Sequence, residues 1–187
     1  MAKLERRYNQ IMKKALMLHS WYGGATKGWC PWLKSELENK GYKVWIPTLP
    51  TMDSPQPDME PMLKVIFDKK FVDEDTVVVG HSLGAVLAIR LAERVKFRVG
   101  IVLAGWDFDD LDPRDDLFWP NPIDHERVRL NVPTWIVPIS ENDPYISPYM
   151  TERMAERLGG KAIMMGKKGH FTKNDGVTEV REILEFV

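Results

Sequence analysis

Short runs of aliphatic and β-branched residues recur along the chain, and most of them show no alternation of polar and apolar positions. Such runs are typical of parallel strands that are covered on both faces of a sheet. They predict six strands, at residues 15–19, 42–47, 76–80, 99–104, 134–139 and 161–165.

Segments with helical periodicity lie between these runs. One of them has Ser147 as a candidate N-cap, Pro148 at the next position and Gly159 as its stop. The predicted helices cover 29–40, 59–70, a segment directly after Ser82, the segment between Ser147 and Gly159, and a last one whose apolar face is formed by Val180, Ile183, Leu184 and Val187.

Because strands and helices alternate, the sequence predicts a three-layer α/β/α sandwich with a mostly parallel six-stranded sheet and right-handed crossovers. We expect the strand order 2-1-3-4-5-6. A length of 187 residues fits a single domain, 1–187. The stretch between Ser82 and Asp143 must hold a helix, two strands and an irregular segment, 105–127, so we expect no large cap.

The composition excludes several classes of partner. Charges nearly cancel, with 26 Lys and Arg against 27 Asp and Glu, so no global field favours nucleic acid or an anionic membrane. No stretch approaches the roughly 18 apolar residues of a membrane-spanning helix. The single cysteine, Cys30, and a start without an uninterrupted apolar core predict a cytoplasmic protein.

The irregular segment 105–127 is rich in aspartate and invites comparison with a calcium site. A calcium loop of the helix-loop-helix type needs Gly at its sixth position and Glu at its twelfth, but counting from Asp107 these are Asp112 and Phe118. We therefore expect a solvated acidic loop, no metal and no cofactor. The closely spaced aspartates of this segment are Asp107, Asp109, Asp110, Asp112, Asp115 and Asp116.

The clearest chemical motif is GHSLG at residues 80–84, which matches G-x-S-x-G. An apolar strand precedes it and a helical pattern follows, which is the context in which this turn exposes a nucleophilic serine. Side chains at Gly80 and Gly84 would collide with the tight backbone. We therefore predict that Ser82 is a nucleophile rather than only part of a turn.

A serine hydroxyl needs a histidine base and an acid that orients the base. His81 should point away from the turn, His19 ends the first strand, and His125 falls in the first turn of a helix after the acidic segment. His170 remains, in a loop just beyond the last predicted strand, and it is our candidate base.

Asp143 is the candidate acid, because it follows the fifth strand in a turn-prone Asn-Asp-Pro context. Glu141 is its nearest rival. The order Ser82, Asp143, His170 is the order expected of an α/β-hydrolase, and all three residues follow predicted strands.

Two backbone donors should stabilise the oxyanion of such a reaction. Leu83 N–H, directly after the nucleophile, is one candidate, and Trp21 N–H in the glycine-containing loop 19–29 is the other. The glycines of this loop, Gly23 and Gly24, could equally well serve only to form a turn before the helix, with no part in an oxyanion site. Aromatic residues that could line a shallow apolar pocket are Trp21, Tyr22, Trp106, Phe118 and Trp119.

The segments LHSWYGG, GWCPWLKSELENKGYKVWIPTLP, TVVVGHSLGA, VPISENDPYIS and GKKGHF together resemble the small serine hydrolases related to retinoblastoma-binding protein nine. The resemblance covers nearly the whole chain. It implies a compact α/β-hydrolase with a Ser-Asp-His triad at Ser82, Asp143 and His170, and little or no cap domain. The first loop departs from the His-Gly dipeptide of many hydrolases, since His19 is followed by Ser20.

These observations predict a cofactor-independent serine hydrolase that cleaves a small carboxylic ester, thioester or amide through an acyl-enzyme. The alternative is a hydrolase-shaped binding protein with weak or no turnover. A nucleotide-binding protein is disfavoured, because the chain contains no G-x-x-x-x-G-K-[ST] and its first loop lacks G-x-G-x-x-G.

Overall fold

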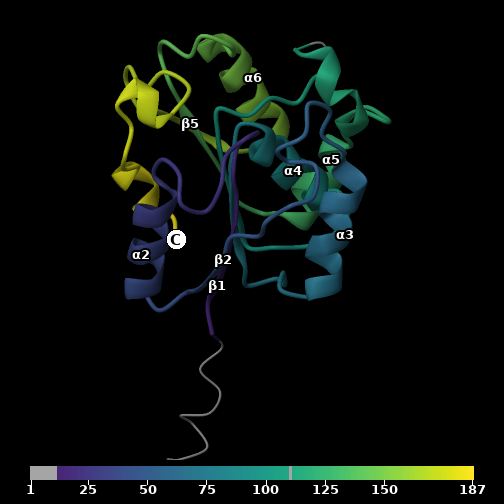
Figure 1. The fold of residues 1–187 in the computed structure, drawn as a ribbon, viewed down its shortest axis with the longest axis vertical. Helices are drawn as coiled ribbons and strands as arrows, with labels where there is room; N and C mark the ends of the chain where they lie inside the picture. The colour runs from purple at the N-terminus through teal and green to yellow at the C-terminus, as the bar shows by residue number, and fades with distance from the viewer. Residues whose placement is uncertain (1–11, 110) are drawn as a thin grey trace, which may run out of the picture.

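The computed structural model describes residues 12–109 and 111–187, and a six-stranded sheet forms its centre (Figure 1). The strands lie in the order β2-β1-β3-β4-β5-β6, and every neighbouring pair is parallel. Their bounds are β1 Lys14–Leu18, β2 Lys43–Trp45, β3 Val77–His81, β4 Val99–Leu103, β5 Trp135–Ile139 and β6 Lys161–Met164. The predicted strands and their order are confirmed.

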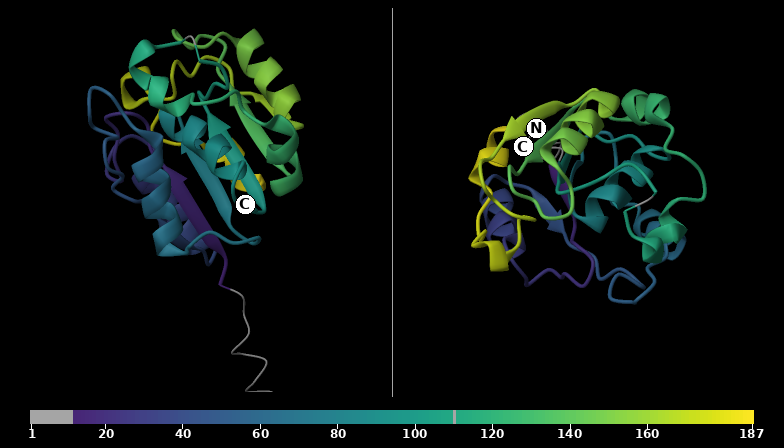
Figure 2. Two further views of the ribbon diagram at one scale, coloured as in Figure 1. Left: turned by 90° about the vertical axis from the view of Figure 1, so that its right-hand side faces the viewer. Right: turned by 90° about the horizontal axis from the view of Figure 1, so that it is seen from above.

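Helices cover both faces of the sheet, which gives the predicted three layers (Figures 1 and 2). Helices α3, α4, α5 and α6 contribute to the apolar cluster on one face. Helix α2 and the C-terminal segment 171–187 contribute to the cluster on the other face. The bounds are α2 Cys30–Asn39, α3 Met59–Lys69, α4 Leu83–Ala92, α5 His125–Asn131 and α6 Pro148–Leu158.

Strand β3 lies inside the sheet between β1 and β4, and all five of its residues are buried. Val78 packs into the first apolar cluster, whereas Val77 and Val79 pack into the second. This alternation is the two-residue period of a strand that is covered on both faces. The segment that follows β3 therefore begins at a strand that is fully buried and paired on both sides.

The end of the chain differs from the prediction. Arg181–Glu185 form a 3₁₀ helix, η3, rather than an α-helix. Val180 and Ile183 are buried, but Leu184 and Val187 are only half-buried. A three-residue spacing of the buried positions fits the three residues per turn of a 3₁₀ helix, which is why the α-helical prediction is wrong here.

The segment 105–127 also contains more structure than expected, because Pro113–Phe118 form the 3₁₀ helix η1. Helix α5 begins at His125, as the sequence predicted. The start of the chain, which we noted for its lack of an uninterrupted apolar core, lies outside the described residues. Asp110 of the acidic segment also lies outside them. No helix within residues 12–109 and 111–187 is long and apolar enough to cross a membrane.

Candidate active site

The candidate residues gather at the carboxyl edge of the sheet, which faces the viewer in the right-hand view of Figure 2. Ser82 follows β3, Asp143 follows β5 and His170 follows β6. Parallel strands bring the chain segments that follow them to a single edge, so residues far apart in sequence meet there. The fold therefore places all three residues where the sequence predicted.

Ser82 occupies a strained turn between β3 and α4. Its φ of 55° and ψ of −124° lie in a region that residues with a side chain rarely adopt. Its N–H donates to the Leu103 carbonyl of the adjacent strand at 2.9 Å, which holds the turn against the sheet. A turn of this kind exposes the hydroxyl at the sheet edge, as a nucleophile requires.

Glycine is required on both sides of Ser82 because backbone approaches closely. A Cβ at Gly80 would lie 2.5 Å from the Gly84 carbonyl oxygen, and one at Gly84 would overlap the carbonyls of Leu18 and His19. The first turn of α4 therefore packs directly against the end of β1. This contact brings the loop after β1 beside the serine.

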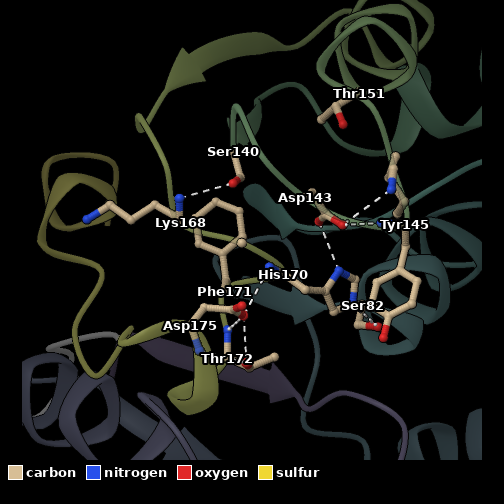
Figure 3. Close-up of polar contacts among 12 residues, drawn as sticks. Ser82, Ser140, Asp143, Tyr145, Thr151, Lys168, His170, Phe171, Thr172 and Asp175 are labelled. Carbon is tan, nitrogen blue, oxygen red and sulfur yellow. Dashed lines mark hydrogen bonds and ion pairs between the residues drawn. The ribbon is translucent and has the colours of Figure 1, made fainter.

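His170 bridges Ser82 and Asp143 (Figure 3). Its Nε2 lies 2.9 Å from Ser82 Oγ, and its Nδ1 lies 2.9 Å from Asp143 Oδ2. An ionised carboxylate can only accept, so the imidazole proton sits on Nδ1 and Nε2 is free to accept from the hydroxyl. The arrangement can remove a proton from Ser82 without any further movement of the base.

Asp143 is held in place by the chain that follows it. Its Oδ1 accepts from the N–H groups of Tyr145 at 2.9 Å and Ile146 at 3.2 Å, and its side chain is only 4% exposed. The Tyr145 ring meets the imidazole edge-on, with ring centroids 4.9 Å apart. Glu141 lies exposed at the surface, so the geometry favours Asp143 over this rival.

The loop that carries His170 is fixed by three side chains. His81 Nε2–H donates to the His170 carbonyl at 2.8 Å, and Trp29 Nε1–H donates to the Phe171 carbonyl at 3.0 Å. The Asp175 carboxylate accepts from His170 N–H at 3.0 Å (Figure 3). The base is thus anchored through its own backbone and through the next residue.

Sequence reasoning missed this function of His81. The His81 ring lies beside the Trp29 ring, with centroids 5.5 Å apart, and reaches the backbone of His170. Burial lowers the pKa of His81 to about 4, so the ring is neutral and donates as an uncharged imidazole. His81 directly precedes Ser82 in the sequence, which was the available signal. Only the fold shows that the His81 side chain supports the loop that carries His170.

The two predicted oxyanion donors lie on neighbouring segments. Within the described residues, neither Leu83 N–H nor Trp21 N–H donates to another backbone group. In the same loop Tyr22 N–H donates to the Met52 carbonyl and Gly23 N–H to the Ser20 carbonyl, so Gly23 does form a tight turn. The oxyanion assignments of Leu83 and Trp21 stay predictions.

A cavity of about 320 Å³ opens beside Ser82 and His170. Of the predicted aromatic residues, Trp21 and Trp106 line it, whereas Tyr22 lines an adjacent cavity of about 280 Å³. Two others do not line it. Phe118 is fully buried in the core, and the Trp119 ring lies under the Arg90 guanidinium.

Sequence reasoning missed several residues of the cavity that opens beside Ser82. The segment after β4 contributes apolar and charged residues, and Tyr145 comes from the segment after β5. Their proximity depends on how the irregular segments fold back over the sheet. The missed lining residues are Ser20, Leu111, Asp112, Arg114, Asp115, Tyr145 and Thr172.

Asp107, His125 and His19 lie apart from the triad and have structural partners of their own. Asp107 pairs with Arg157 at 2.6 Å and with His125 Nε2 at 2.8 Å, and these partners lower its pKa despite burial. His19 Nδ1 lies 2.9 Å from the Ser20 carbonyl oxygen. In the part of the chain that the structure describes, no group of three or more His, Cys, Asp or Glu is arranged to hold a metal ion.

The chain is similar to known hydrolases over nearly its whole length. A family model described as serine hydrolase matches residues 15–187. The serine hydrolase RBBP9 of Rattus norvegicus is 27% identical over 179 residues, which is 93% of each chain. The hydrolase YdeN of Bacillus subtilis is 25% identical over 176 residues, 91% of this chain and 92% of its own. The crystal structure of the B. subtilis ydeN gene product superposes with a TM-score of 0.83 at 23% identity, covering 93% of this chain and 96% of its own.

Proposed function

The chain belongs to the serine hydrolase family, and from this premise we propose that it cleaves a small carboxylic ester by transferring the acyl group to Ser82. The observation that carries the proposal is the bridging position of His170, 2.9 Å from both Ser82 Oγ and Asp143 Oδ2. A hydroxyl alone is a poor nucleophile, and a neutral imidazole within hydrogen-bond reach is the base that activates it.

In the first half of the reaction, His170 Nε2 takes the hydroxyl proton as Ser82 Oγ attacks the ester carbonyl carbon. The carbonyl π electrons move onto oxygen, and the backbone N–H groups of Leu83 and Trp21 are our proposed donors to that oxyanion. When the oxyanion collapses, the carbon–oxygen bond to the alcohol breaks and His170 returns the proton to the leaving oxygen. Asp143 stabilises the imidazolium and keeps its own charge throughout.

In the second half, water replaces the serine as nucleophile. His170 accepts a proton from the water as its oxygen attacks the acyl carbon, and the proton then passes to Ser82 Oγ as the acyl bond breaks. The products are the free acid and the unmodified enzyme. Thioesters and amides would follow the same route, with sulfur or nitrogen as the leaving atom.

The test is hydrolysis of a panel of p-nitrophenyl esters, thioesters and arylamides by wild type, Ser82→Ala and His170→Ala. We expect an initial burst of product equal to the enzyme concentration, followed by slower turnover, for substrates whose deacylation limits the rate. The value of kcat/KM should rise with pH as the base loses its proton. Equal slow hydrolysis by all three proteins would leave the binding-protein alternative standing.

We also propose a small-molecule substrate and a cytoplasmic location, the latter supported by the single cysteine, Cys30. We propose no nucleic-acid partner, which the near-balance of charges supports. Fractionation of cells that express the tagged protein would test the location directly.

A further inference from the structure

The cavity beside Ser82 contains a buried carboxylate without a hydrogen-bond partner. Asp115, in η1, has no exposed surface, and neither of its oxygens makes a hydrogen bond within the described residues. Asp115 is nevertheless one of the residues around the cavity that Ser82 and His170 line. Buried polar groups are normally paired, so an unpaired carboxylate at this position needs an explanation.

Within the described residues Asp115 forms no ion pair, although its charge and that of Arg114 attract each other. Arg114 also lines the cavity, but its guanidinium pairs with Asp112 and lies over the Trp21 ring, 4.8 Å from its centroid. Asp112 and Asp116 both oppose ionisation of Asp115 through charge repulsion. Once the Arg114–Asp112 pair is counted as neutral, the cavity keeps one negative charge, that of Asp115.

Two indole groups approach this carboxylate without satisfying it. The Nε1–H groups of Trp119 and Trp106 favour its ionised form, yet both nitrogens lack a hydrogen bond of ordinary geometry. Burial is the larger effect and raises the pKa of Asp115 to about 6. The carboxylate is therefore ionised at neutral pH, is shielded from water, and lies where a cation in the cavity would feel its charge strongly.

We propose that the cavity selects esters that carry a protonated amine, and that Asp115 is the specificity-determining residue for this cation. The inference rests on the proposed esterase function and adds the charge of its substrate. An ammonium group supplies the positive charge that the cavity lacks. In a partly solvated site with an effective dielectric constant of roughly 25 to 50, attraction between two charges about 5 Å apart corresponds to a preference of roughly 10- to 100-fold.

The test compares two series of p-nitrophenyl esters that share one leaving group. One series carries ω-amino acids of three to six carbons, and the other carries the same chains with a terminal methyl in place of the ammonium. Each kcat/KM is divided by the rate of base hydrolysis of that ester. For at least one chain length, wild type should prefer the amine by roughly 10- to 100-fold, and Asp115→Asn should reduce that ratio to about one. The exposed neighbour Asp116→Asn is the matched control and should keep the preference.

The pH dependence of the same ratio tests the proposal without any variant. Dividing the two kcat/KM values cancels the ionisation of His170, which both esters share. The wild-type ratio should rise as pH increases through about 6 and then level off, because the amine stays protonated while Asp115 gains its charge. A wild-type ratio of one or less at pH 8 for every chain length, or a preference that Asp115→Asn retains, would overturn the inference. Absence of any Ser82-dependent hydrolysis of the neutral esters would instead contradict the proposed function.

Discussion

The two sides of the active-site cavity differ in how their polar groups are paired. On one side, which we call the nucleophile wall, Ser82, His170 and Asp143 form a continuous set of hydrogen bonds. On the other, which we call the aspartate wall, Trp106 and Asp115 line the cavity with Trp119 beside them, and their buried polar atoms lack partners. The polar groups of the nucleophile wall are already paired in the free protein, whereas those of the aspartate wall are left for a bound ligand to pair with.

This difference assigns separate tasks to the two walls. Hydrogen bonds that exist before the substrate arrives need no reorganisation during the reaction, which suits groups that move protons. Unpaired groups in a cavity destabilise the free protein but distinguish a substrate that pairs with them from one that does not. We expect changes in the nucleophile wall to reduce the rate for every substrate, and changes in the aspartate wall to alter which substrate is preferred.

The largest effect should follow from changing the acid of the nucleophile wall. Asp143→Asn removes the charge that stabilises the imidazolium and allows the wrong tautomer of His170, so kcat should fall by roughly 10⁴-fold. Glu141→Gln is the matched control and should change kcat by less than about threefold, because its side chain is exposed. Steady-state kinetics with one activated ester measures both. A large loss in Glu141→Gln, with little change in Asp143→Asn, would reverse the acid assignment.

A glycine substitution tests the backbone beneath the same wall. Gly84→Ala places a Cβ against the carbonyls of Leu18 and His19, whereas Gly24→Ala meets nothing within 4 Å. Overpacking against backbone typically costs about 1–3 kcal/mol, so Gly84→Ala should lower the free energy of unfolding by at least that amount and reduce activity as well. Denaturant unfolding measures the difference. Equal stability of the two variants would show that the close packing of α4 against β1 is unnecessary.

A smaller loss is expected when the support of the base is removed. His81→Phe keeps a ring but deletes the donor to the His170 carbonyl, and misplacement of a reacting group by about 1 Å can cost on the order of 10²-fold in rate. The loss should appear in kcat more than in KM, and His81→Gln, which retains a donor, should recover part of it. Because His81 stays neutral down to about pH 4, the pH profile above that value should keep its shape in His81→Gln. An increase in KM with no change in kcat would argue against a positioning role.

The smallest effect concerns stability and the aspartate wall. Burial raises the pKa of Asp115 to about 6 in the folded protein, above its ordinary value of 3.8. The folded state therefore binds the proton of Asp115 more tightly than the unfolded state does. The stabilisation from that proton is complete below pH 3.8 and is lost as pH rises to about 6. Asp115→Asn cannot ionise, so its stability relative to wild type should increase over this range by on the order of 1–3 kcal/mol and stay constant above it. Thermal unfolding at several pH values measures this, and a difference that does not depend on pH would contradict it.

Much of the nucleophile wall could be predicted from the sequence because it depends on local patterns. The G-x-S-x-G turn, the buried strands and the chain order of Ser82, Asp143 and His170 place these residues at one sheet edge without knowledge of any side-chain contact. The support from His81 could not be predicted, since it connects residues 89 positions apart.

The aspartate wall could be predicted only in part, because its segments have no regular periodicity. Trp106 lines the cavity as expected, but Phe118 turned inward to the core and Trp119 lies under Arg90. Asp115 looked like one more member of a solvated acidic run, yet it is fully buried. Which residues of an irregular segment face inward depends on how the segment packs over the sheet, and neither composition nor spacing determines that packing.

The most direct test of the central claim is to identify the residue that reacts with a fluorophosphonate. The probe mimics the acyl group and forms a stable bond only with an activated serine. Intact-mass measurement and peptide mapping of the native protein should show one adduct, on Ser82, and His170→Ala should form it far more slowly. Ser82→Ala should form none. If Ser82→Ala is labelled at the wild-type rate, or if the wild-type adduct maps to another residue, Ser82 is not the nucleophile and the proposed mechanism is wrong.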